Sequence, residues 1–132
     1  MEVIIRKAKE KEGKELARIE AACFPPAEAA SEAAILERLE AFPENFYVAE
    51  QNGKLVGFIN GGVTDEQYLP DEMYHDIGLH KPDGAYQTVF GLNVLSECRR
   101  QGIAEKLVNA FIEGAKQAGR KGVILTCKDH MI

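Results

Sequence analysis

Two arginines and two small residues lie close together in the stretch CRRQGIAEKL. A helical pattern begins in the same stretch, and the first amides of a helix lack intrahelical partners and carry partial positive charge. Phosphate binds such an end when no side chain blocks its approach. Gly102 and Ala104 leave that approach clear, while Arg99 and Arg100 add two full charges. The pattern therefore predicts a pyrophosphate site, although a solvated turn with a chance glycine has the same composition.

The stretch differs from other phosphate-binding loops. It lacks the Gly-Lys-Ser/Thr sequence that places a lysine and a hydroxyl on a nucleotide and its magnesium. It also lacks the third small residue of GxGxxG, and no acidic residue follows about 20 positions later in a strand. A nucleotide hydrolase or a dehydrogenase is therefore disfavoured.

Other reactive side chains are scattered. Cys23, Cys98 and Cys127 are odd in number and have no CxxC spacing, which argues against a disulfide framework and a zinc site. Cys127 has no basic partner nearby in the sequence, so a small buried filler is favoured over a nucleophile. Some carboxylates could bind an ammonium or accept its proton through water, but each is typical of solvated surface. These are Glu28, Asp65, Glu66, Asp71 and Glu72.

The pattern of apolar residues, prolines and glycines predicts a mixed α/β domain with helices laid against a sheet. Asn52-Gly53 predicts a tight hairpin, Ser31 an N-cap, and Gly119 the end of the last helix. The expected elements are a strand at 2–8, helices at 12–24 and 27–42, a hairpin at 45–63, a long loop at 64–84, a strand at 85–95, a helix at 99–118 and a strand at 122–127.

The overall composition is that of one globular domain, residues 1–132, with 45% hydrophobic and 28% charged residues. A net charge of −5 argues against a general nucleic-acid binder. No apolar run is long enough to span a membrane, and the N-terminus does not resemble a signal peptide. We therefore expect a cytoplasmic protein without membrane or nucleic-acid partners.

The segment RRQGIA resembles the [RQ]-x-x-G-x-[GA] signature of the GNAT superfamily of acetyl-CoA-dependent N-acetyltransferases. The resemblance covers essentially the whole chain, since the expected elements follow GNAT order. Four further segments are most similar to the arylalkylamine (serotonin-type) N-acetyltransferase group and its microbial relatives. They are CFPPAEAAS (23–31), VAEQNGKLVGFINGG (48–62), LHKPDG (79–84) and ILTCKDHMI (124–132).

The resemblance implies where acetyl-CoA binds. Pantetheine would lie in a V-shaped opening between the strands at 85–95 and 122–127, and the pyrophosphate would lie on the amides that open the following helix. A backbone N–H in the splayed strand would polarise the thioester carbonyl. The implied cofactor-binding residues are Leu92, Asn93, Val94, Arg99, Arg100, Gln101, Gly102, Ile103, Ala104 and Glu105. Phe24, Pro25 and Pro26 would line an amine pocket, and no metal takes part.

The sequence departs from the group in two places. The two histidines that relay the amine proton in vertebrate members are replaced by Thr88 and Phe90, and no other catalytic residue is assigned. His75 and His80 precede that strand and are expected on the surface or in loop packing. The group's tyrosine, which follows the CKD segment, is also missing; the tyrosines present lie upstream and are Tyr47, Tyr68, Tyr74 and Tyr86.

The missing tyrosine implies a GNAT domain that is truncated at its C-terminus, without the usual last helix and strands, and of low activity. An incomplete sheet edge could pair with a second copy of the chain. The resemblance as a whole implies direct transfer of acetyl from acetyl-CoA to a small primary amine in a ternary complex. A non-catalytic acyl-CoA-binding or regulatory domain, and an acetyltransferase acting on a protein amine, stay open as alternatives.

Overall fold

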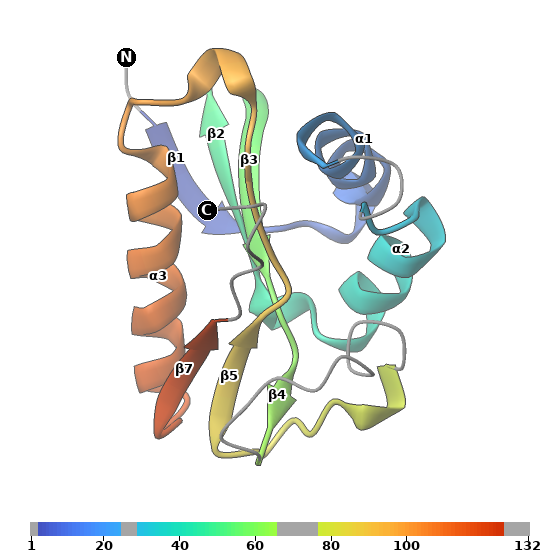
Figure 1. Ribbon diagram of the computed structural model, residues 1–132, viewed down its shortest axis with the longest axis vertical. Helices are drawn as coiled ribbons and strands as arrows, with labels where there is room; N and C mark the ends of the chain where they lie inside the picture. The colour runs from blue at the N-terminus through green and yellow to red at the C-terminus, as the bar shows by residue number, and fades with distance from the viewer. Residues whose placement is uncertain (1–2, 25–28, 66–76, 126–132) are drawn as a thin grey trace.

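The computed structural model describes residues 3–24, 29–65 and 77–125. Two small sheets form its centre (Figure 1). The first has the order β1-β2-β3-β6 and is antiparallel, whereas the second has the order β4-β5-β7 and pairs β5 with β7 in parallel. The strands are β1 (Val3–Lys7), β2 (Phe46–Gln51), β3 (Lys54–Asn60), β4 (Val63–Thr64), β5 (Tyr86–Val89), β6 (Gly91–Val94) and β7 (Gly122–Leu125).

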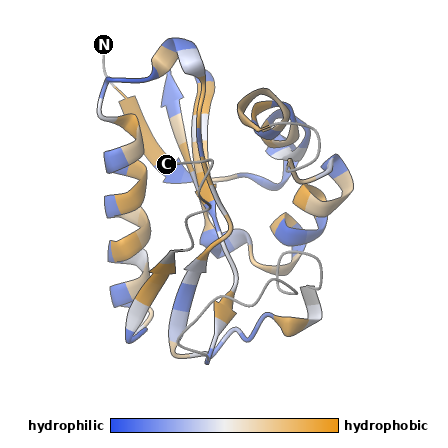
Figure 2. Ribbon diagram, in the orientation of Figure 1, coloured by the Kyte–Doolittle hydropathy of each residue, from blue (hydrophilic) through white to orange (hydrophobic). Residues whose placement is uncertain are grey.

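Helices cover both faces of the first sheet. Helix α3 (Ile103–Gln117) lies on one face, and α1 (Gly13–Cys23) and α2 (Glu32–Ala41) lie on the other (Figure 1). Apolar and polar residues alternate along α3 at helical spacing, so one side of it packs on the sheet (Figure 2). The α1–α2 side of the core contains Leu16, Ile19, Ile35, Leu39, Phe42, Phe46 and Phe58. The α3 side contains Ile59, Val89, Val94, Ile103, Leu107 and Phe111.

Three local signals in the sequence are confirmed. Asn52 and Gly53 have φ values of 56° and 76° and join β2 to β3 in the expected hairpin. The Ser31 side chain accepts a hydrogen bond from the amide of Ala34 and caps α2. Gly119, at φ 79°, follows the end of α3. The sequence thus located the hairpin, the N-cap of α2 and the end of α3 correctly, whereas β4 (Val63–Thr64) extends into the expected loop at 64–84.

Three expected elements have different bounds. The helix at 27–42 begins only at Glu32, after its N-cap Ser31. The strand at 85–95 is two strands, β5 and β6, separated at Phe90, whose amide donates to the carbonyl of Asn60 at 2.7 Å. The helix at 99–118 begins only at Ile103, because Arg100 and Gly102 have φ values of 66° and 75°. A right-handed helix cannot pass through left-handed residues, so the segment before α3 is a loop.

The break in β5–β6 has a counterpart in the neighbouring strand. Gly61 and Gly62 separate β3 from β4 at the same level of the sheet. A Cβ atom on Gly61 would lie 1.9 Å from the carbonyl oxygen of Thr88, so only glycine permits this close approach of the two chains. The paired breaks divide the strands into two sheets.

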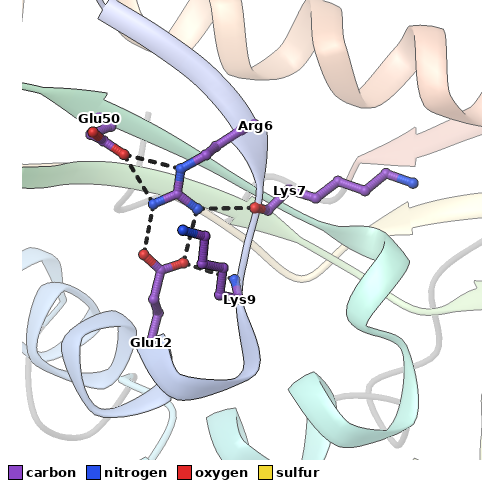
Figure 3. Close-up of polar contacts among 5 residues, drawn as sticks. All are labelled: Arg6, Lys7, Lys9, Glu12 and Glu50. Atoms are coloured by element: carbon purple, nitrogen blue, oxygen red, sulfur yellow. Dashed lines mark hydrogen bonds and ion pairs between the residues drawn. The ribbon is translucent and has the colours of Figure 1, made fainter. Parts of the chain in front are cut away.

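A polar network ties β1 and β2 to the segment before α1 (Figure 3). Arg6 donates two hydrogen bonds to the Glu12 carboxylate, at 3.0 and 2.7 Å, and its Nε donates to Glu50 at 3.0 Å. The hydrogen bonds from Arg6 hold the pKa of Glu12 below its ordinary value. The network lies away from the open edge described below, and we assign it a structural role.

Among the residues that the structure describes, no helix is both long enough and apolar enough to cross a membrane.

Candidate acyl-CoA site

Strand β6 has a partner on one side only within the described part of the chain. It pairs with β3 from Gly91 to Val94, whereas β7 pairs with β5 and its last described partner is Val89. Among the described residues, β6 and β7 are therefore not joined by a ladder, at the place where the resemblance implies an opening between the strands at 85–95 and 122–127. A strand edge of this kind presents amides and carbonyls to a ligand.

The register decides which backbone groups of β6 face the open edge. The amide of Leu95 donates to the carbonyl of Val56 at 2.9 Å, and the Asn93 carbonyl also faces β3, since it lies 2.5 Å from a Cβ built on Gly57. Backbone direction alternates along an antiparallel strand. Leu92 and Val94 therefore direct their backbone groups toward the open edge, whereas Asn93 does not.

Part of this edge is already occupied by side chains. The Val94 carbonyl accepts from Arg99 Nε at 3.2 Å and from the thiol of Cys23 at 3.5 Å. Burial raises the pKa of Cys23, so the thiol stays protonated and is a poor nucleophile. Both groups of Leu92 and the amide of Val94 are then the part of β6 that suits an added pantetheine chain.

The expected anion site follows β6 directly. A short 3-10 helix, η5 (Ser96–Cys98), leads into the left-handed residues and then to α3, whose N-cap is Gly102. No side chain caps this end, and the first intrahelical bond runs from the Lys106 amide to the Gly102 carbonyl at 3.1 Å. A Cβ on Gly102 would meet nothing within 4 Å. The amides from Gly102 to Glu105 are therefore available to an anion.

The other side chains of this loop have distinct places. Arg99 and Arg100 are exposed, as are Ala104 and Glu105, whereas Ile103 is buried in the core. Gln101 accepts a hydrogen bond from the Gln51 side chain at 3.1 Å, which ties the loop to the end of β2. The expected cofactor residues lie along one continuous segment from β6 to the first turn of α3, although the Asn93 backbone faces β3 and the Ile103 side chain is buried in the core.

A second group of polar side chains lies beside β6 and was not expected from the sequence. Glu20 on α1, Asn60 at the end of β3 and Asn93 on β6 surround Gly91, and we call these three residues the Gly91 cluster. Their exposed fractions are 6%, 0% and 1%. Glu20 follows Leu16 by four positions and precedes Cys23 by three, so its place on an apolar helix face was the signal in the sequence.

The side chains at the positions of the missing histidine pair have structural roles. The Thr88 hydroxyl donates to the Gly62 carbonyl at 2.7 Å. The Phe90 ring packs against the ring of Phe42, with 6.0 Å between centroids, and the Arg38 guanidinium lies over it at 4.9 Å. Neither side chain supplies a base.

His80 packs in its loop. Its Nδ1 accepts from the Val63 amide at 2.9 Å and its ring lies 4.7 Å from that of Phe42. The accepted bond leaves the proton of the neutral ring on Nε2. Burial lowers the pKa of His80, so the ring is neutral at physiological pH.

Other candidates divide between the described and undescribed parts of the chain. Asp65 accepts from the Ala85 amide at 3.0 Å and lies 3.4 Å from Lys81 Nζ, so it closes a loop. Phe24 is half-buried at the end of α1.

The described residues hold no group of three or more His, Cys, Asp or Glu that could bind a metal. Pro25, Pro26, Glu28, Glu66, Tyr68, Asp71, Glu72, Tyr74, His75 and Cys127 lie outside the described residues.

Comparison with known proteins identifies the family. The family model described as the acetyltransferase (GNAT) family matches residues 13–131. The chain belongs to the GNAT acetyltransferase family. The mixed α+β fold expected from the sequence is confirmed by this match and by similar solved structures. The open strand edge and the uncapped helix start are thus features of a GNAT acetyltransferase fold in this chain.

Proteins similar to this GNAT chain are described with different activities. It is 27% identical over 132 residues to the probable hydrolase YhcX of Bacillus subtilis strain 168, covering 93% of this chain but 25% of that protein. The loading GNATL domain of CurA from Lyngbya majuscula has a TM-score of 0.85 at 20% identity, covering 98% of this chain and 68% of the other.

Two further solved structures contain acyl-CoA ligands. The GphF GNAT-like decarboxylase, in complex with isobutyryl-CoA, has a TM-score of 0.85 at 26% identity, covering 96% and 67% of the two chains. A GNAT family acetyltransferase from Brucella melitensis, in complex with acetyl-CoA, has a TM-score of 0.66 at 20% identity, covering 96% and 77%. Acyl-CoA ligands thus occur in proteins that share this fold.

Proposed function

We propose that this chain transfers the acetyl group of acetyl-CoA to a small primary amine by direct reaction in a ternary complex. The observation that carries the proposal is the continuous segment from Leu92 to Glu105, which joins an open strand edge to an uncapped helix start. Membership of the GNAT acetyltransferase family supports the same activity. Arylalkylamines are the acceptors to try first, because the sequence most resembles that group.

The chain's own groups suit the two parts of the co-substrate. Leu92 and the Val94 amide would pair with pantetheine as an added strand does, and the amides from Gly102 onward would bind the pyrophosphate. The side chains of Arg99 and Arg100 lie at the same end and supply positive charge. A Leu92 amide aimed at the thioester oxygen would stabilise the negative charge that develops there.

The reaction needs a neutral amine. An ammonium first gives one proton to a base, because it has no lone pair. The nitrogen then attacks the thioester carbonyl carbon and the C–S bond breaks. Sulfur leaves as the thiolate and takes up the second proton that nitrogen loses. The products are the N-acetylated amine and free coenzyme A, and no metal is required for the transfer.

Calorimetry and thiol release test the proposal together. We expect acetyl-CoA to bind the folded protein, and phenethylamine, tyramine, spermidine or an acceptor peptide to release free thiol in stoichiometry with an acetylated product. Binding without thiol release for any amine would favour the non-catalytic acyl-CoA-binding alternative. Release with the peptide alone would favour a protein amine as acceptor. No binding at millimolar acetyl-CoA would overturn the proposal.

Decarboxylation of a β-carboxyacyl-CoA is the second candidate. The similarity to the GphF GNAT-like decarboxylase favours it, at 26% identity and a TM-score of 0.85. The same Leu92 amide would stabilise the thioester enolate that forms when the bond between the α-carbon and the carboxylate breaks and carbon dioxide leaves. The α-carbon then takes a proton. Incubation with malonyl-CoA separates the candidates, because decarboxylation yields acetyl-CoA and carbon dioxide without an amine.

A further inference from the structure

The Gly91 cluster brings three buried polar side chains to one point next to β6. A Cβ on Gly91 would lie 3.6 Å from Asn93 Nδ2, 3.7 Å from Asn60 Nδ2 and 3.8 Å from Glu20 Oε1. The three side chains come from α1, β3 and β6, and each is more than nine-tenths buried. They therefore meet beside Gly91, where one carboxylate oxygen and two amide nitrogens are the nearest side-chain atoms.

The hydrogen bonds within the cluster leave most of its polar capacity unused. Glu20 Oε1 accepts from Asn93 Nδ2 at 3.0 Å, and Glu20 Oε2 accepts from the Ala30 amide at 2.9 Å. Asn93 Oδ1 and both polar atoms of the Asn60 side chain are buried and have no hydrogen-bond partner among the described residues. A carboxylate has about four lone-pair sites, so Glu20 can accept further bonds. Each unpartnered buried atom costs on the order of 1–3 kcal/mol.

Two of the three unpartnered atoms are amide oxygens, which accept hydrogen bonds, and Glu20 adds a carboxylate. Glu20 and Asn93 Oδ1 offer oxygen lone pairs, and rotation of the Asn60 amide exchanges its oxygen and nitrogen. A primary ammonium has three N–H donors and one positive charge, which complements one carboxylate and two amide oxygens. A hydroxyl has one donor and no charge, so it would leave at least one acceptor unpaired.

The cluster also has the right place for an acceptor. Asn93 directly follows Leu92, and its side chain lies on the α1 side of the sheet. The side chains of Leu92 and Val94 pack on the α3 side. An amine on the cluster would therefore approach the open edge from the α1 side, next to the amide that we assign to the thioester carbonyl.

We infer that Glu20, Asn60 and Asn93 form the subsite that holds the primary amino group of the acceptor. The inference rests on the proposed acetyl transfer and adds the residues that select the acceptor. It accounts for two buried unpartnered acceptors, the side-chain oxygens of Asn60 and Asn93, which neither the fold nor the proposed acetyl-CoA segment from Leu92 to Glu105 explains.

Asn60→Leu separates a binding role from a structural one. Leucine is similar in size but removes two unpartnered polar atoms, so we expect the melting temperature without ligand to rise. We expect the KM for the amine to increase tenfold or more, while the dissociation constant for acetyl-CoA stays within twofold. A lower melting temperature with an unchanged amine KM would overturn the inference.

Glu20→Gln has a matched control in Glu12→Gln. Gln at position 20 can accept from the Ala30 amide and, once the Asn93 amide rotates, donate to Asn93 Oδ1, so the contacts of the fold are retained while the charge is lost. We expect a tenfold or larger increase in amine KM for Glu20→Gln and none for Glu12→Gln, whose carboxylate binds Arg6 instead. Equal amine KM values in the two variants would contradict the proposed subsite.

A direct binding readout keeps the subsite testable apart from activity. In the presence of coenzyme A, methylammonium chloride should shift the side-chain amide NMR signals of Asn60 and Asn93, and potassium chloride at the same ionic strength should not. If these signals shift but no acetyl is transferred, the subsite stands and the proposed function fails. If acetyl is transferred but the signals do not respond to methylammonium, the subsite is wrong.

Discussion

The cofactor segment and the Gly91 cluster are adjacent in space but are built in opposite ways. The cofactor segment is continuous in sequence, from Leu92 to Glu105, and offers mainly backbone groups and exposed arginines. The cluster is buried, offers side chains, and joins residues as far as 73 positions apart. The first site is largely preformed by local backbone geometry, whereas the second depends on the packing of α1, β3 and β6.

This difference determines how each site can be changed. Substitutions other than proline leave the backbone N–H and C=O groups in place, so most variants disturb the cofactor segment only through conformation or by blocking access. Side chains of the cluster can be exchanged one at a time for residues of similar size. Variants of the two kinds should therefore separate loss of acetyl-CoA binding from loss of acceptor selection.

The largest expected effect comes from Gly102→Val. A β-branched residue at φ 75° costs about 1–2 kcal/mol of strain and covers the amides that receive the pyrophosphate. We expect acetyl-CoA affinity, measured by calorimetry, to fall about tenfold or more. Gly53→Val is the matched control, because Gly53 has φ 76° and equally open surroundings in the hairpin. Equal affinities in the two variants would place the pyrophosphate elsewhere.

A smaller effect is expected from Arg100→Gly. Glycine adopts the φ of 66° at this position without strain, so the variant removes a cation while keeping the loop. An exposed charge contributes about 0.2–1 kcal/mol, and affinity for acetyl-CoA should fall about two- to fivefold at low salt. The deficit should shrink as ionic strength rises. A deficit independent of salt would assign Arg100 a role in loop shape instead.

The smallest effect on either site is expected from Glu12→Gln, which should lower stability alone. Its partner Arg6 keeps the carboxylate charged, and the lost ion pair should cost about 1 kcal/mol. Because the pKa of Glu12 is lowered on folding, its contribution is present above the ordinary value of 4.5 and is lost as the pH falls through the folded value. Denaturation between pH 3 and 7 should therefore show a flatter profile for the variant.

The contrast between the two sites also explains what the sequence could predict. The arginine pair, Gly102 and the helical pattern after them are adjacent in the sequence, so one stretch predicts both the helix, which the structure contains, and the anion site that we propose. The exact start of α3 is not, because the left-handed φ of Arg100 depends on the loop as a whole. The break at Phe90 likewise depends on the partner strand, through the hydrogen bond to Asn60.

The Gly91 cluster could not be predicted in the same way. Glu20 looks like one more glutamate in a helix, and Asn60 and Asn93 look like polar ends of apolar strands. Only the pairing of β3 with β6 and the packing of α1 bring them together. Their unpartnered atoms are a property of the folded chain, since every polar group is hydrated when the chain is unfolded.

Among the described residues β6 pairs on one side only, and this has a consequence for solvent exchange. Asn93 directs its amide into the ladder with β3, whereas its neighbours Leu92 and Val94 direct theirs outward. Protection against deuterium exchange should therefore alternate along this strand, with a slow amide between two fast ones. A ligand that adds itself as a strand would slow the fast pair and leave Asn93 unchanged. The exchange rates of the Leu92 and Val94 amides, compared with that of Asn93, would thus report whether the edge is occupied.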